Sequence, residues 1–315
     1  MSRLPTETAG TFVTARDGFT VYGLRTGQLE VSVIPELGAN LISLRSVRSG
    51  REWMWQRPDA PVLFTNACGD PFERSPLAGA VECLPTIAAC TLEGRALPDH
   101  GEAWAVPWQL DEPAFRDGVI HTCAQLPVSG LHVTRRLYLD GPVVHLEYRA
   151  VNLSPERAVP CLWAFHPLLS VDPDDRLEFP ESVRTLHAAS SKGFPELAGK
   201  HTWDWPESSP GLRLDRVGSG WPAGSYAKLF AEFPAGSVAR AALLRGAERL
   251  EFRFDPAQLP YLGIWYTHCG WHGFTHLALE PASDRCDSVA DAQSQPLAPL
   301  GARQWCFQME WSSVE

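Results

Sequence analysis

Apolar and polar residues alternate with a period of two along much of the chain, the pattern of β-strands with one buried face. The alternation is clearest in five segments, at residues 29–38, 131–140, 143–153, 249–255 and 303–311. Short segments containing glycine, proline or aspartate, which favour turns, lie between such stretches. We therefore expect many strands joined by turns.

Helical patterns are scarce, and the 27 prolines are scattered throughout the chain. Residues 286–293 predict one short helix with Asp287 or Ser288 as its N-cap. Residues 184–225 are rich in Gly, Pro, Ser and Trp, which predicts long ordered loops. We find no internal repeat and no linker, so the pattern indicates an all-β protein, a large antiparallel sandwich with few short helices, forming a single domain over residues 1–315.

Composition narrows the classes of partner. The formal net charge of −10 disfavours nucleic acid and anionic membranes and allows a neutral or cationic small molecule. Neither a signal-peptide core nor an apolar run of about 18 residues is present. The eight cysteines include no CxxC pair, which predicts reduced thiols in a cytoplasmic protein. The twelve tryptophans suit either stacking on sugar rings or filling a large core.

Three segments combine titratable side chains with an unusual setting. His100 lies in "LPDHGEAWAVPW", a stretch with two prolines and two tryptophans, and His166 ends an apolar strand before a proline. In "FTHLALEP", Leu277 and Leu279 should face the core, which turns His276 and Glu280 to the opposite face. Each also has a plain structural interpretation, as a hydrogen-bonded histidine or a strand-end acid. A functional site requires that these remote residues meet in one groove.

An ordered set of segments resembles the aldose 1-epimerase (galactose mutarotase-like) family. The matching segments are residues 29–55, 79–87, 97–108, 165–171, 261–271, 277–292 and 297–311. The resemblance implies a β-supersandwich and an isomerase that interconverts the α and β anomers of an aldose without a metal or an organic cofactor. It implies that His100 binds and polarises the sugar, that His166 is the general acid at the ring oxygen and that Glu280 is the general base at the anomeric hydroxyl.

These residue types suit the reaction, since ring opening removes a proton from O1 and delivers one to the ring oxygen. Ordinary pKa values of about 4.3 for Glu and about 6.5 for His make a carboxylate base and an imidazolium acid accessible near neutral pH. We expect a neighbouring carboxylate to keep the His166 imidazole protonated.

Further residues are candidates for contact with the sugar. Asp99 precedes His100, while Trp104 or Trp108, together with Trp265, are candidates for a stacking wall. The position of the family's arginine is filled by either Arg74 or Glu82. The family's best-known members have an aromatic pair after the second histidine, where this chain has Pro167, Leu168 and Leu169. The sequence thus resembles a divergent branch acting on a different or modified sugar.

Three alternatives remain open. His268, His272 and His276 are spaced four apart, as in a helical metal site of a zinc or manganese hydrolase, although Gly270 and Gly273 favour a hairpin there. A non-catalytic carbohydrate-binding or sugar-sensing protein would use the same fold. A sugar hydrolase or lyase would pair Glu280 with a second acid; the candidates for this acid are Glu82, Asp99 and Glu102.

Overall fold

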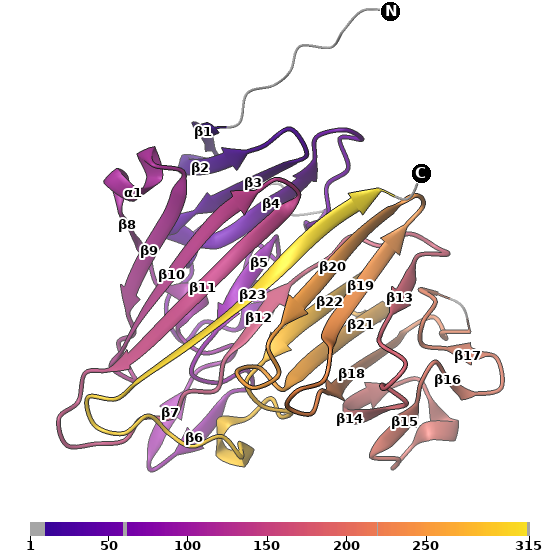
Figure 1. Cartoon of the computed structure of the whole chain (residues 1–315). Coiled ribbons are helices and arrows are strands. Elements are labelled where there is room, and N and C mark those ends of the chain that lie inside the picture. Colours follow the sequence, from indigo (N-terminus) through magenta and orange to yellow (C-terminus); the bar gives the residue numbers. More distant parts are fainter. Residues whose placement is uncertain (1–9, 59–61, 219, 314–315) are drawn as a thin grey trace, which may run out of the picture.

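The computed structural model describes residues 10–58, 62–218 and 220–313, and consists mainly of two large antiparallel sheets packed face to face (Figure 1). The all-β sandwich with few short helices is therefore confirmed. The predicted single domain over 1–315 stays a prediction, and its two ends lie outside the described residues.

The first sheet has eleven strands. In spatial order they are β1 (Gly10–Arg16), β2 (Phe19–Arg25), β3 (Leu29–Ile34), β4 (Asn40–Ser46), β5 (Ala80–Cys83), β12 (Ala164–Pro167), β22 (Phe274–Ala282), β21 (Tyr261–Trp271), β18 (Ser225–Glu232), β14 (Thr185–Lys192) and β15 (Thr202–Asp204).

The second sheet has eight strands, and β23 runs through its middle between β11 and β20 (Figure 1). In spatial order they are β13 (Arg176–Glu178), β19 (Ala239–Arg245), β20 (Glu248–Phe254), β23 (Ala302–Ser313), β11 (Val143–Asn152), β10 (Leu131–Asp140), β9 (Val119–Gln125) and β8 (Gln109–Leu110).

Short elements connect these sheets. Two hairpins are formed by β6 (Cys90–Leu92) with β7 (Arg95–Leu97) and by β16 (Glu207–Ser209) with β17 (Leu212–Arg213). The helical segments are α1 (Glu112–Arg116) and the 3₁₀ turns η1 (Pro35–Leu37), η2 (Phe72–Arg74), η3 (Ala103–Ala105), η4 (Pro195–Leu197) and η5 (Val289–Asp291). In the described part of the chain, no helix is long and apolar enough to cross a membrane.

The period-two segments form strands as predicted, in β3, β10, β11, β20 and β23. In β10 the side chains of Leu131, Val133 and Leu137 are buried, whereas those between them are partly exposed or paired. Leu137 lies opposite Leu146, which in turn lies opposite Phe307. These side chains belong to the core between the two sheets.

Two local predictions need correction. The short helix predicted at 286–293 is only the 3₁₀ turn η5, and Ser288 is its cap, since its Oγ accepts a hydrogen bond from the Ala290 N–H. The predicted loops at 184–225 contain strands, because β14 pairs along β18 and carries β15 on its outer edge. Trp203 of β15 is fully buried, which explains why this Trp-rich segment is ordered against the core.

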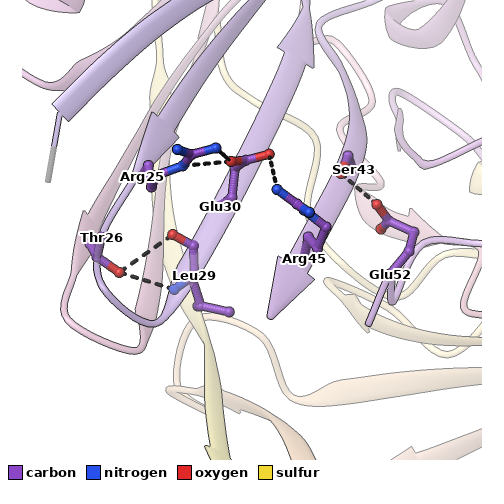
Figure 2. A network of polar contacts seen from close by, with 7 residues as sticks. All are labelled: Arg25, Thr26, Leu29, Glu30, Ser43, Arg45 and Glu52. Carbon is purple, nitrogen blue, oxygen red and sulfur yellow. Dashed lines mark hydrogen bonds and ion pairs between the residues drawn. The ribbon is translucent and has the colours of Figure 1, made fainter. Parts of the chain in front are cut away.

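Polar contacts tie the N-terminal strands together (Figure 2). Glu30 of β3 lies between Arg25 of β2 and Arg45 of β4 and bonds both guanidinium groups. Glu52 accepts hydrogen bonds from the Ser43 hydroxyl and from backbone N–H groups, although burial still raises its pKa. These contacts stabilise the first strands of the larger sheet.

The larger sheet turns one face to the core and the other to the candidate site. Leu277 and Leu279 belong to the core, so His276 and Glu280 lie on the outer face, as predicted. Glu280 lies opposite Gly263 in the hairpin formed by β21 and β22.

Candidate active site

A cavity of about 660 Å³, including space open to solvent, lies on the outer face of the larger sheet over β12, β18, β21 and β22. This size is in the usual range for a small-molecule site. Its walls combine the rings of Phe72, Trp265 and Trp271 with several polar side chains. The arrangement of aromatic surface and a few polar groups suits a small polar ligand with apolar C–H faces.

His100 reaches this cavity from a strained turn. Its φ of 58° is in the left-handed region, and Gly101 follows with a φ of 72°. A Cβ at Gly101 would lie 2.3 Å from the Leu84 carbonyl oxygen, so this position requires glycine. The His100 ring stacks on Phe72 with 3.9 Å between centroids. The turn and the stacked ring together fix the direction of the imidazole.

Asp99 lies directly behind His100. Its Oδ1 is 2.9 Å from His100 Nδ1, and its Oδ2 accepts a hydrogen bond from the Phe72 N–H. Burial raises the pKa of Asp99, but the hydrogen bond and charge of His100 and the Phe72 N–H outweigh burial and lower it overall. Asp99 therefore stays a carboxylate beside the imidazole.

His166 ends β12 and also lines the cavity. Its ring centroid is 5.3 Å from that of His100, and its Nε2 is 3.7 Å from Glu280 Oε1. Burial, and then the charges of His100 and Lys228, lower the pKa of His166 well below its ordinary value. The expectation that a neighbouring carboxylate keeps this imidazole protonated is therefore wrong, because burial disfavours the charged form more strongly.

Glu280 is fully buried and does not itself line the cavity. Its Oε2 accepts a hydrogen bond of 2.5 Å from Lys228 Nζ, and its Oε1 has no hydrogen-bond partner within the described part of the chain. Lys228 and His166 both line the cavity. The carboxylate thus lies behind a lysine and a histidine, one next to each of its oxygens.

Lys228 is a buried cation between two carboxylates. Burial lowers its pKa, but the charges of Glu280 and Asp287 and the hydrogen bond to Glu280 outweigh burial and raise it overall. Asp287 lines the same cavity, with its Oδ1 3.8 Å from Lys228 Nζ. Lys228 is therefore an ammonium ion at neutral pH.

Trp265 faces the cavity and is held by a neighbouring histidine. Its indole N–H donates a hydrogen bond of 3.2 Å to His276 Nε2. The His276 ring packs on Trp55 with 4.6 Å between centroids. Burial, and then the charge of His166, lower the pKa of His276 to about 3. His276 is consequently a neutral acceptor that orients the Trp265 ring.

Four predicted contact residues do not reach this cavity. Arg74 is exposed in η2 and lies outside the lining. Glu82 points from β5 into the core, where it bonds Arg135, Tyr148 and Trp163. Trp104 and Trp108 are buried, and their indole N–H groups donate to backbone carbonyls.

The structure explains the positions of Glu82 and Trp104 in different ways. Glu82 is one residue past Val81, which lies opposite His166, and successive side chains of a strand point to opposite faces. Trp104 lines a neighbouring hollow that shares Phe72, His166 and Leu168 with the main cavity. Glu82, Trp104 and Trp108 are thus buried parts of the frame around the site and do not form the walls of the main cavity.

The metal-site alternative gains no support from the geometry, and two of the three second acids of the hydrolase alternative lie outside the cavity. His268 Nδ1 lies 3.1 Å from the Trp221 carbonyl oxygen, and His272 Nε2 lies 3.1 Å from Glu73 Oε2. Among the described residues, no three His, Cys, Asp or Glu side chains are grouped to hold a metal ion. Glu102 is buried, accepts backbone hydrogen bonds and lies outside the cavity lining, as Glu82 does, whereas Asp99 lines the cavity beside His100.

Among the cavity residues that sequence reasoning missed are Phe72, Lys228, Trp271 and Asp287. One signal for Lys228 was available. In "SYAKLFAE" a lysine interrupts an otherwise apolar stretch, between Ala227 and Leu229, which both belong to the core. A charged residue at such a position must either reach solvent or find a partner. No comparable signal distinguishes the other three.

A scan against sequence-family models and a search of curated proteins found no match. Solved structures, however, match almost the whole chain. A galactose mutarotase related enzyme from Lactobacillus acidophilus is 15% identical with a TM-score of 0.65, over 94% of this chain and 98% of that one.

Two further solved structures have a similar fold. A galactose mutarotase-like protein from Clostridium acetobutylicum is 12% identical, with a TM-score of 0.68 over 97% of this chain and 99% of that one. Another from Lactobacillus casei is 15% identical, with a TM-score of 0.65 over 93% and 100%. The protein thus has the galactose mutarotase-like fold, at the low identity of a divergent chain, as the sequence resemblance implies.

Proposed function

We propose that this protein is an isomerase of the aldose 1-epimerase type, which interconverts the α and β anomers of an aldose by acid–base ring opening. One observation carries the proposal. Two imidazoles from remote parts of the chain, His100 and His166, line one aromatic-walled cavity, and each has a carboxylate beside it. Asp99 lies beside His100 and Glu280 beside His166.

The base is the His166–Glu280 pair. The resemblance makes Glu280 the base and His166 the acid, but Glu280 lies behind Lys228 and His166, whereas His166 lines the cavity and burial favours its neutral form, which can accept a proton. His166 accepts the proton of the anomeric hydroxyl, and the Glu280 carboxylate stabilises the imidazolium that forms. Histidine is the side chain that most often acts as a general base.

The acid is His100, backed by Asp99. It delivers a proton to the ring oxygen as the C1–O5 bond breaks, which leaves an open-chain aldehyde. Rotation about C1–C2 presents the other face of the carbonyl. The two imidazoles then run the same proton transfers in reverse, and the ring closes as the other anomer. The rings of Trp265 and Trp271 are placed to stack on the C–H faces of the sugar.

The test is the rate of anomer interconversion across a panel of aldoses, measured by polarimetry or exchange NMR. His166→Ala and Glu280→Gln are each expected to slow the reaction by about 10²–10⁴-fold, the usual contribution of a general base. The sugar affinity of Glu280→Gln should stay within a few-fold. His272→Gln, in the exposed hairpin turn, is the matched control and should leave the rate unchanged.

A non-catalytic sugar-binding protein is the second candidate, and it is favoured by the complete burial of Glu280 beside Lys228. The same panel separates the two. A wild type that binds a sugar but never speeds its mutarotation would establish the binding function in place of the isomerase.

A further inference from the structure

A charged lysine, Lys228, lies in the wall of the cavity. The Lys228 side chain is 5% exposed, and burying an ammonium ion is costly unless it is paired. Gly263 makes the pairing possible, because a Cβ there would lie 3.2 Å from Lys228 Nζ and 3.3 Å from Glu280 Oε2. The chain thus keeps space open for this ion pair where β18 and β21 meet.

We infer that Lys228 is a catalytic residue, whose ammonium group donates a hydrogen bond to the anomeric oxygen and stabilises the charge that develops on it. This rests on the proposed function and adds a third polar group to the two imidazoles. Lys228 has no role in the family pattern that the sequence resembles.

Its position supports contact with that oxygen. Lys228 Nζ bonds Glu280 Oε2, while His166 Nε2 lies 3.7 Å from Glu280 Oε1. Both side chains also line the cavity. A substrate oxygen that gives its proton to His166 Nε2 therefore lies close to the Lys228 ammonium group as well.

The ammonium group has donors to spare. An ammonium carries three N–H groups. Among the described residues, Lys228 donates one hydrogen bond, to Glu280, and Asp287 Oδ1 at 3.8 Å is beyond hydrogen-bond distance. At least one donor is therefore left for a ligand in the cavity.

The chemistry needs a donor at this place. When the ring opens, O1 loses its proton and becomes the aldehyde oxygen. When the ring closes, O5 attacks C1 and negative charge develops on O1 until the His166 imidazolium returns the proton. An N–H fixed at O1 stabilises both the polarised carbonyl and this oxyanion. No bond to Lys228 forms, because an ammonium ion has no lone pair to attack the aldehyde.

The first experiment compares Lys228→Met with wild type. Loss of one preorganised donor is expected to lower kcat about 10²–10³-fold, with KM changed only a few-fold. Methylammonium added to Lys228→Ala should restore part of kcat, because it can occupy the vacated space. Lys192→Met, on the exposed end of β14, is the matched control and should keep the wild-type rate.

A second comparison removes the effect of leaving Glu280 unpaired. The Lys228→Met/Glu280→Gln double variant contains neither charge, so it should fold where Lys228→Met fails. We expect it to be at least 10-fold slower than Glu280→Gln alone. Equal rates for these two variants, in an active wild type, would overturn the role of Lys228 and leave the isomerase proposal intact. A wild type that binds sugar without mutarotation would overturn both.

Discussion

His276 should make the stability of the fold depend strongly on mildly acidic pH. The side chain is fully buried, and its pKa is about 3 in the folded protein, against 6.5 for the unperturbed imidazole. Unfolded chains take up a proton below 6.5, whereas folded molecules stay neutral down to about 3. The folded-state pKa is lowered, so stability falls as pH decreases through this window.

The size of the effect follows from proton linkage. Between pH 7 and pH 5 the folded imidazole stays neutral, and almost all of the change comes from protonation of the unfolded chain. For one histidine this removes about 2 kcal/mol of the free energy of unfolding. His166, whose pKa is also lowered by burial, adds a loss in the same direction.

The assay is urea unfolding of wild type and His276→Gln at both pH values. Glutamine can still accept the Trp265 N–H hydrogen bond but does not titrate. Between pH 7 and pH 5, the free energy of unfolding should fall by about 2 kcal/mol more for the wild type than for the variant. This difference does not depend on how stable the variant is at pH 7. The control is His201→Gln, at an exposed position, whose free energy of unfolding should fall as much as that of wild type. An equal loss for wild type and His276→Gln would show that the buried imidazole does not titrate as argued.

Two further predictions concern the frame of the site. Glu82→Ala leaves the buried Arg135 guanidinium unpaired and should lower the free energy of unfolding by about 3–5 kcal/mol in urea titrations; a loss below about 1 kcal/mol would contradict this account of the pair. Gly101→Ala places a Cβ against the Leu84 carbonyl and strains a positive φ. It should lower the free energy of unfolding by about 1–3 kcal/mol and, under the proposed function, slow mutarotation, because His100 must shift. A variant as stable and as active as wild type would refute the requirement for glycine in this turn.

The period-two pattern predicted the sandwich well, because strand alternation is a local property. In β10 and β11 the buried and exposed positions match the sequence pattern. The same logic gave the outer-face placement of His276 and Glu280. Residues 184–225 were harder, since their strands depend on pairing with β18 rather than on their own composition.

The site was only partly predictable, for a physical reason. Residue type and strand position identified His100 and His166, but the protonation state of His166 depends on burial, which is set by the folded surroundings. Glu82 and Arg74 were candidates because of their place along the chain. In the structure Glu82 points into the core and Arg74 is exposed. Lys228 meets Glu280 across 52 residues, a contact that no local pattern reveals.

The Glu82 contacts tie the two sheets together behind His166. Arg135 comes from β10 and Tyr148 from β11 of the smaller sheet, yet both bond a carboxylate in β5, the strand next to β12. Evolutionary change at these positions should therefore be coupled, with an altered Arg135 tolerated only alongside a compensating residue at 82. Engineering of the cavity on the outer face of the larger sheet should therefore leave these contacts between the sheets unchanged.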